Sequence, residues 1–208
     1  MQRIALFGGT FDPIHNGHLH SALELAQQYH LARVHMVPCY QPVHRVAPQL
    51  TAEQRFQMLQ LACQPHSVLH ADDRELRRQG PSYSIDTLQS LRDEYGDDAQ
   101  LNLVMGADAF AQFDRWHRSD DFLDLANIVV MWRAGELPPN LAASDYSNAI
   151  KSHDDAIQCS RGALTSVQLT PWEISSTQIR ASLAAGEPVV QYLPEAVSKF
   201  VAEQQLYR

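Results

Sequence analysis

Short apolar runs separated by helical stretches recur along most of the chain, and this alternation limits the possible folds more than any other feature of the sequence. Each run is rich in residues that favour β-strands and is too short for an ordinary helix. Strands that alternate with helices form parallel sheets with right-handed crossovers, so the sequence predicts an α/β fold with a doubly wound, mostly parallel sheet. The six predicted strands are Ile4–Phe7, Val34–Val37, Val68–His70, Leu101–Met105, Ile128–Met131 and Ser166–Leu169.

Helical periodicity and capping residues predict the connections between these strands. Apolar residues three and four apart share one face of a helix from about residue 17 to 29. Thr51 and Gln54 form a capping-box pattern before a second helix, with Phe56, Leu59 and Cys63 on one face. Ser84 is predicted to cap a third helix, which Gly96 ends.

The chain has 208 residues, of which 45% are hydrophobic and 19% charged, which is enough for one domain with a substantial core. We expect a single domain over residues 1–208, because no repeat or second periodic block is present. Residues 134–160 are polar and aperiodic, which predicts a surface excursion. Residues 175–208 are predicted to be helical, with Pro194 at a first helical position before Val197, Phe200 and Val201.

Charge and cysteine content exclude several classes of function. The net charge of -8 leaves no broad basic surface, so we expect no nucleic-acid partner. Three isolated cysteines give neither a disulfide framework nor a thiolate zinc site. No apolar run approaches the roughly 18 residues of a membrane span, so we expect no membrane association and a cytoplasmic location.

The segment from Gly8 to His18 follows the first predicted strand directly and carries the strongest chemical signal. Gly8 and Gly9 allow the backbone to approach a ligand closely, and the next helix presents free N–H groups with a partial positive charge. His15 and His18 are three residues apart at the helix entrance, so their rings point the same way. The pattern indicates a site for a phosphate group.

A zinc site is the alternative interpretation of this segment. His15, His18 and His20 carry imidazoles that bind zinc, but no cysteine or suitably spaced carboxylate completes a set of ligands. A Gly-Gly turn or a His-x-x-His spacing is weak evidence alone. Glycines and histidines in this order, between a strand and a helix, favour the phosphate site.

The same segment resembles the His-x-Gly-His signature of a nucleotidyltransferase superfamily, here His15-Asn16-Gly17-His18. Further segments resemble the bacterial nicotinate mononucleotide adenylyltransferase family and span most of the chain. Two positions depart from that family's usual pattern: Val43 replaces a proline, and Ser84 replaces a threonine. The matching segments are Pro42–Arg45, Ser82–Ser84 with Thr87 and Leu88, Gly106–Asp108, the region of Trp116, and Ile174–Arg180.

The resemblance implies a Rossmann-like nucleotidyltransferase fold and a specific reaction. The 5'-phosphate of nicotinate mononucleotide attacks the α-phosphorus of ATP, giving deamido-NAD and pyrophosphate in NAD biosynthesis. Mg²⁺ is expected with ATP as co-substrate, and no residue is assigned to it. A homo-oligomer is compatible with the sequence.

The resemblance also implies roles for individual residues. His15, His18 and Arg180 are the expected catalytic residues, the histidines on the ATP phosphates and the arginine on departing pyrophosphate. The expected ATP-binding residues are Gly8, Gly9, Thr10, Phe11, His15, His18, Gly106, Asp108, Ile174, Ser175, Ser176, Thr177 and Arg180. The expected residues for nicotinate mononucleotide are Thr10, His44, Arg45, Ser82, Tyr83, Ser84 and Trp116.

Simpler interpretations exist for several of these residues and for the whole chain. Asp108 is equally suited to cap a helix, Trp116 to lie in the core, and Arg180 to be a solvated helix residue. The chain as a whole could instead use nicotinamide mononucleotide or phosphopantetheine. A non-catalytic nucleotide-binding module is the alternative from another class.

Overall fold

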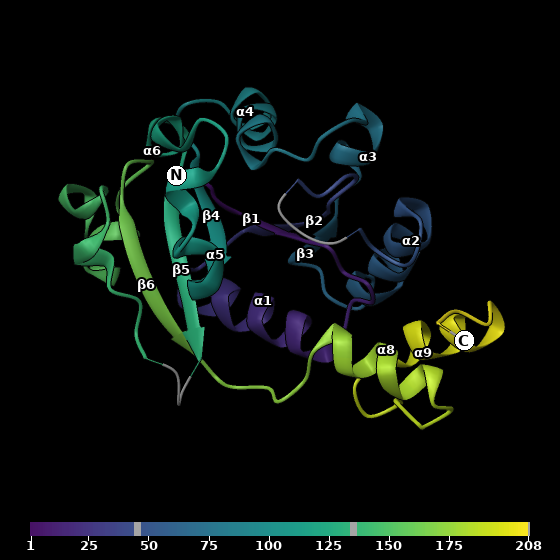
Figure 1. Cartoon of the computed structure of the whole chain (residues 1–208). Coiled ribbons are helices and arrows are strands. Elements are labelled where there is room, and N and C mark those ends of the chain that lie inside the picture. Colours follow the sequence, from purple (N-terminus) through teal and green to yellow (C-terminus); the bar gives the residue numbers. More distant parts are fainter. Residues whose placement is uncertain (44–46, 134–136, 208) are drawn as a thin grey trace.

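A computed structural model describes residues 1–43, 47–133 and 137–207 of the chain, and its centre is one six-stranded sheet (Figure 1). Every neighbouring pair of strands is parallel, and the strand order is β3-β2-β1-β4-β5-β6. The order reverses between β1 and β4, which is where ligands bind in doubly wound sheets. The strands are β1 (Arg3–Gly9), β2 (Arg33–Pro38), β3 (Leu69–Ala71), β4 (Gln100–Gly106), β5 (Asn127–Arg133) and β6 (Leu164–Leu169).

Helices cover both faces of this sheet (Figure 1). One face carries α1 (Asn16–Gln28), α2 (Ala52–Cys63), α8 (Ser176–Ala184) and α9 (Glu195–Glu203). The opposite face carries α4 (Ser84–Tyr95), α5 (Ala107–Phe110) and α6 (Phe122–Leu125). The short helix α3 (Arg74–Arg78) connects β3 to α4, and α7 (His153–Ala156) lies before β6.

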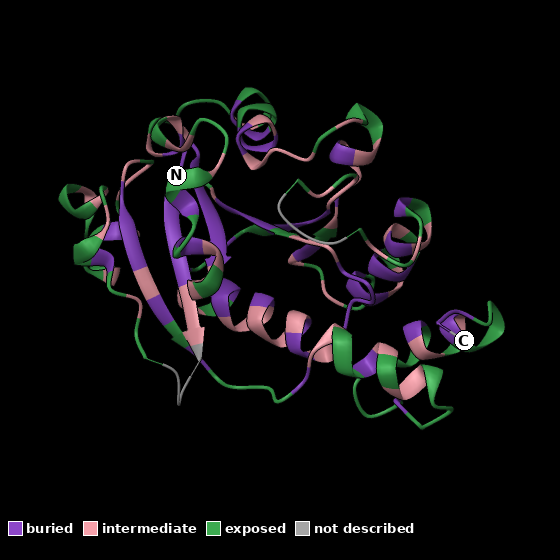
Figure 2. Ribbon diagram, viewed as in Figure 1, coloured by how far each residue is buried: buried purple, intermediate pink, exposed green. Residues whose placement is uncertain are grey.

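The period-two alternation of the strands divides the core into two apolar layers. In β1, Ala5 and Phe7 pack with α1 and α2, whereas Ile4 and Leu6 pack with α4. All four side chains are buried, as Figure 2 shows for the central strands. A strand apolar on both faces is stable only between two helical layers, so this composition enforces the three-layer architecture.

The six predicted strands and the parallel α/β architecture are confirmed, with β3 starting one residue later than expected. The capping box of α2 is also confirmed: the Gln54 amide donates to Thr51 Oγ1 at 3.3 Å, and the Thr51 amide donates to Gln54 Oε1 at 3.1 Å. Gly96 ends α4 with a φ of 74°, a left-handed conformation that glycine adopts without strain.

Two local predictions were wrong, and one residue of a predicted helix face is less buried than its neighbours. Tyr83, with extended backbone angles, is the N-cap of α4, so Ser84 is the first helical residue and does not cap the helix. Pro194 occupies the N-cap of α9, one position earlier than expected. Phe56 is only half-buried, because α2 turns Arg55 and its apolar neighbours Met58 and Leu59 towards the core.

The regions at residues 137–160 and 175–207 differ in how tightly they pack. The first contains short 3-10 turns, α7 and an isolated bridge from Ile150 to Leu164, while residues 134–136 lie outside the described part. The second packs α8 and α9 against α1 and α2, and it ends with Leu206 and Tyr207 buried.

Within the described ranges, no helix is long and apolar enough to cross a membrane.

Candidate active site

Two adjacent cavities open where β1 and β4 end. The first has a volume of about 580 Å³, and Thr10, Tyr83 and Trp116 are in its wall. The second has a volume of about 460 Å³, and His15 and His18 are in its wall. Gly106 and Asp108 line both cavities, so the two spaces meet at the end of β4.

The signature histidines stand together at the start of α1. His15 is the N-cap, and its Nδ1 accepts a hydrogen bond from the His18 amide at 3.4 Å. The His15 amide donates in return to His18 Nδ1 at 3.3 Å, so the pair forms a reciprocal capping box. The rings are stacked with centroids 3.7 Å apart, as the three-residue spacing predicts. Two imidazoles therefore share the positive end of a helix beside the second cavity.

Phe11 packs against the His18 ring. It is buried with a positive φ of 49°, and its ring meets the His18 ring edge-on at a centroid distance of 5.2 Å. A Cβ on Gly9 would lie 2.9 Å from the Phe11 ring, so only glycine allows the ring to approach. In this structure Phe11, expected from the sequence to bind ATP, contacts His18 and is 2% exposed.

The segment that begins α8 holds the signature backbone. Arg180 Nη1 donates to the carbonyl oxygen of Asp12 at 2.7 Å, and Ser176 Oγ donates to that of Pro13 at 3.0 Å. Ser175 caps α8 by accepting from the Gln178 amide. Of the described candidates, Phe11, Ser175, Ser176, Thr177 and Arg180 line neither cavity, whereas Ile174 lines the second.

The carboxylate of Asp12 links this segment to the last turn of the chain. Tyr207 Oη donates to Asp12 Oδ1 at 2.7 Å, and the Gln49 amide donates to Asp12 Oδ2 at 2.8 Å. Burial and the neighbouring Asp12 charge raise the pKa of the Tyr207 hydroxyl, which therefore stays protonated as the donor. This buried contact joins residues 195 positions apart.

Aromatic and polar groups line the first cavity. Trp116 is half-buried against Phe113 and Phe122, so it lies in a core cluster and in the cavity wall at once. The Tyr83 and His117 rings lie with centroids 4.4 Å apart. Ser82 Oγ accepts from the amides of Tyr40 and Gln41, so this hydroxyl connects two loops.

The remaining candidates are placed as follows. Gly8, Gly9, Thr10, Ser82, Tyr83 and Ser84 line the first cavity. Asp108 is in the first turn of α5, whose N-cap is Gly106, so it is not the cap itself. His44 and Arg45 lie outside the described residues.

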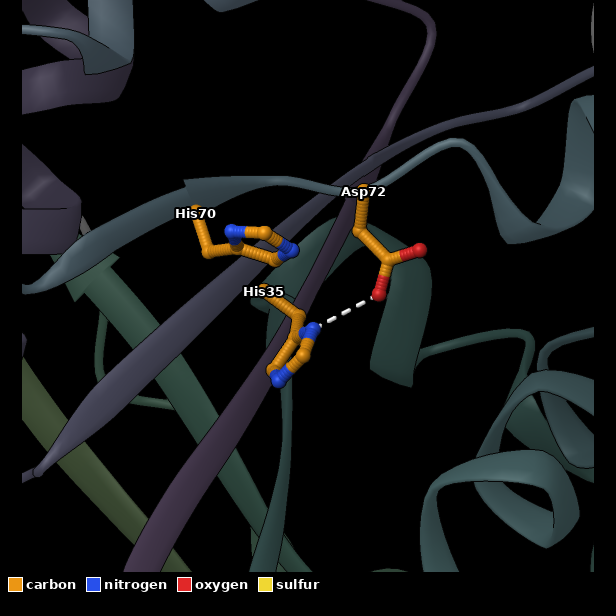
Figure 3. A group of neighbouring side chains, drawn as sticks. All are labelled: His35, His70 and Asp72. Carbon is orange, nitrogen blue, oxygen red and sulfur yellow. Dashed lines mark hydrogen bonds and ion pairs between the residues drawn. The ribbon is translucent and has the colours of Figure 1, made fainter. Parts of the chain in front are cut away.

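A group of potential metal ligands lies elsewhere, on the side of the sheet near β2 and β3 (Figure 3). His35 Nδ1 is 2.6 Å from Asp72 Oδ2, and His35 Nε2 is 2.8 Å from Tyr95 Oη. Arg74 Nε donates to the same Asp72 oxygen at 2.7 Å. Burial alone would raise the pKa of the Asp72 carboxyl, but the hydrogen bond from His35 and the Arg74 charge outweigh it and lower that pKa. Internal contacts thus use the ligand atoms of His35 and Asp72, and His70 alone is exposed.

Sequence reasoning missed several residues around the cavities. Glu75 is buried in the wall of the first cavity, and Trp132 and Trp172 are in the wall of the second. Arg55 is 1% exposed beneath the two loops that follow β1 and β2. Its position on the apolar face of α2, three and four residues before Met58 and Leu59, was the available signal.

Comparison with known proteins shows which family the chain belongs to. The model of the cytidylyltransferase-like family matches residues 6–182, most of the chain. The chain belongs to that family. A protein of Marinomonas sp. named "Probable nicotinate-nucleotide adenylyltransferase" is 40% identical over 210 residues, covering 99% of this chain and 94% of the relative. A Pseudomonas aeruginosa protein of the same name is 42% identical, covering 100% and 98%.

A solved structure supports the fold assignment. The Plasmodium falciparum nicotinic acid mononucleotide adenylyltransferase complexed with NaAD aligns with a TM-score of 0.73 at 14% identity, covering 100% of this chain and 98% of that one. At that identity the likeness establishes the shared architecture only. The family resemblance and the Rossmann-like fold expected from the sequence are confirmed.

Proposed function

We propose that this member of the family transfers the adenylyl group of ATP to nicotinate mononucleotide, giving deamido-NAD and pyrophosphate. The stacked His15–His18 pair at the start of α1 carries the proposal, because it stands beside a cavity that adjoins a second one. Full-length relatives with adenylyltransferase names support the choice of substrates.

ATP occupies the second cavity in this proposal. The two imidazoles at the positive end of α1 face the triphosphate, whose charge the net -8 of the chain would otherwise repel. Asp108 accepts hydrogen bonds from the ribose hydroxyls, and Gly106 leaves room for the nucleoside. Mg²⁺ enters as part of the Mg–ATP substrate.

Nicotinate mononucleotide occupies the first cavity. Its pyridine ring stacks on Trp116, and its carboxylate receives a hydrogen bond from the Ser84 amide at the start of α4. The Tyr83 amide donates to the Pro81 carbonyl at 3.2 Å and would have to leave it to bind the same carboxylate. His44 and Arg45, which lie outside the described residues, remain the proposed ligands of the mononucleotide 5'-phosphate. The two cavities meet at Gly106 and Asp108, and the mononucleotide phosphate attacks the α-phosphorus there.

The transfer needs no protein nucleophile. The acceptor phosphate oxygen forms a bond to the α-phosphorus while the bond to the bridging oxygen of pyrophosphate breaks, and charge accumulates on the phosphoryl oxygens. His15 and His18 donate to that charge from a fixed position, which is where electrostatic catalysis is strongest. Arg180 holds the departing pyrophosphate in this proposal, and one of its nitrogens, Nη1, also donates to the Asp12 carbonyl of the signature backbone.

Pyrophosphate release tests the proposal. ATP is supplied with nicotinate mononucleotide, nicotinamide mononucleotide or phosphopantetheine, and the nicotinate form should give the highest kcat/KM. His18→Ala should lower kcat by about 100-fold with the fold intact, the usual effect of losing one such donor. His70→Ala, at an exposed histidine of β3, is the matched control and should keep full activity. Higher turnover of another acceptor, or an active His18→Ala, would contradict the proposal.

A further inference from the structure

Arg55 on α2 is a buried cation to which the proposed mechanism gives no role. The side chain is charged, but it is only 1% exposed and lies on the apolar face of the helix. Its guanidinium is held by three backbone carbonyl oxygens. Nη1 donates to Thr10 at 2.7 Å, Nη2 donates to Cys39 at 2.7 Å, and Nε donates to Leu50 at 3.3 Å. Burying a charge is costly, and such directed hydrogen bonds are what offset the cost.

The two short hydrogen bonds go to two different loops. Thr10 follows β1 and belongs to the signature segment, which leads to His15 and the ATP cavity. Cys39 follows β2 and begins the loop that leads to residues 44–45. Both Thr10 and Cys39 line the first cavity. A planar guanidinium has a rigid fork of donors, so Arg55 fixes the separation of these two loops.

The positive charge of Arg55 also remains unneutralised by a direct partner. Across the described ranges, no carboxylate forms an ion pair with its guanidinium. The buried carboxylates of Asp12 and Glu75 act on the same neighbours as Arg55, at Tyr207 and Cys39, so they balance its charge without touching it. The directed hydrogen bonds to the two loops, and not an excess of charge, therefore carry the inference.

We propose that Arg55 is a positioning residue that sets the distance between the loop on the ATP side and the loop on the acceptor side. The inference rests on the proposed function, because it concerns how the acceptor phosphate meets the α-phosphorus. Each substrate still binds its own loop without Arg55, but the reacting atoms are no longer aligned. Displacements of about 1 Å from this alignment lower turnover by about 100-fold.

Arg92 on α4 supplies a matched control. It is also buried, and its guanidinium also donates to three backbone carbonyl oxygens, those of Gly96, Ala99 and Leu125. These carbonyls precede β4 and β5, so they lie at the amino ends of the strands, opposite the cavities. The two arginines thus share their chemistry and differ in which end of the sheet they hold together.

The experiment compares Arg55→Lys with Arg92→Lys in the full chain. Lysine keeps the charge but loses the planar fork, so both variants should unfold at a lower temperature than the wild type. Only Arg55→Lys should lower kcat, by about tenfold or more, while both KM values change by less than about threefold. Arg55→Gln, which buries no charge, replaces Arg55→Lys in the same assay if the lysine variant does not fold.

The outcomes separate the two proposals. Equal kcat values for the Arg55 and Arg92 variants would overturn the positioning role while leaving the reaction established. A large rise in KM with unchanged kcat would overturn it as well, because binding and not alignment would be lost. A wild-type chain that releases pyrophosphate with neither mononucleotide would overturn the proposed function itself.

Discussion

Replacing Gly17 with alanine tests whether the placement of the imidazoles matters separately from the stability of the fold. Gly17 is the second residue of α1 and is buried between His15 and Ile174. An added Cβ would lie 2.9 Å from Ile174 Cγ2 and 3.1 Å from two atoms of the His15 ring. Ordinary carbon contacts lie at about 3.5 Å or more, so the neighbours must move by roughly 0.5 Å.

The effects of this substitution on stability nearly cancel. Alanine is favoured over glycine inside a helix by about 1 kcal/mol. Displacing the His15 ring weakens the N-cap hydrogen bond to the His18 amide, which costs about 1 kcal/mol. The free energy of unfolding therefore changes by less than about 1 kcal/mol, and Tm by less than about 4 °C for a chain of this size.

Activity should change much more. A displacement of this size at a catalytic donor lowers kcat by roughly 10- to 100-fold, which is about 1.4 to 2.7 kcal/mol of barrier. Steady-state pyrophosphate release gives kcat and KM, and thermal unfolding gives Tm on the same preparation. Gln27→Ala, at an exposed position of α1, is the control for helix propensity. A Gly17→Ala enzyme with wild-type kcat would refute the claim that these rings act through their position.

Three further substitutions test other contacts. Gly106→Ala places a Cβ 2.6 Å from Asp108 Oδ1, so the carboxylate must turn away and KM for ATP should rise about tenfold. Tyr207→Phe removes the donor to buried Asp12 and should cost about 2 kcal/mol, seen as a Tm lower by roughly 4 to 8 °C. Asp72→Asn should cost about 3 kcal/mol at pH 7 in denaturant unfolding, because it breaks a buried ion pair with Arg74. The Asp72 pKa is lower in the folded chain, so its contribution is complete above about pH 4 and is lost as pH falls, and the variant should show less of this acid dependence.

Each of these has a result that would contradict it. An unchanged KM for ATP in Gly106→Ala would mean that Asp108 does not contact the nucleotide. Wild-type Tm in Tyr207→Phe would mean that Asp12 finds another donor. An acid unfolding curve for Asp72→Asn that parallels the wild type below pH 4 would assign the acid sensitivity to other carboxyl groups.

Local patterns in the sequence were sufficient to predict the architecture and the signature segment. Runs that are apolar on both faces, such as the strand from Ile4, specify a parallel sheet between two helical layers. Thr51 lies within one helical turn of Gln54, and His15 lies within one turn of His18. Residues this close in the sequence of a helix are also close in space. The contacts that decide these features are therefore made between residues that are near one another in the sequence.

Other parts of the site depend on contacts between distant segments and could not be predicted. The position of Arg55 on the apolar face of α2 indicates burial, but only the fold shows that carbonyls of two loops surround it. Asp12 is held by Tyr207 from the far end of the chain. The start of α4 was misplaced by one residue because local propensity favours serine at an N-cap, whereas the fold places Tyr83 there without a side-chain cap.

The wall that both cavities share at Gly106 and Asp108 has a thermodynamic consequence. A compound bound in one cavity contacts the same two residues as a compound bound in the other, so the occupancies are linked. Such linkage is reciprocal: whatever factor ATP imposes on the affinity for the mononucleotide, the mononucleotide imposes on the affinity for ATP.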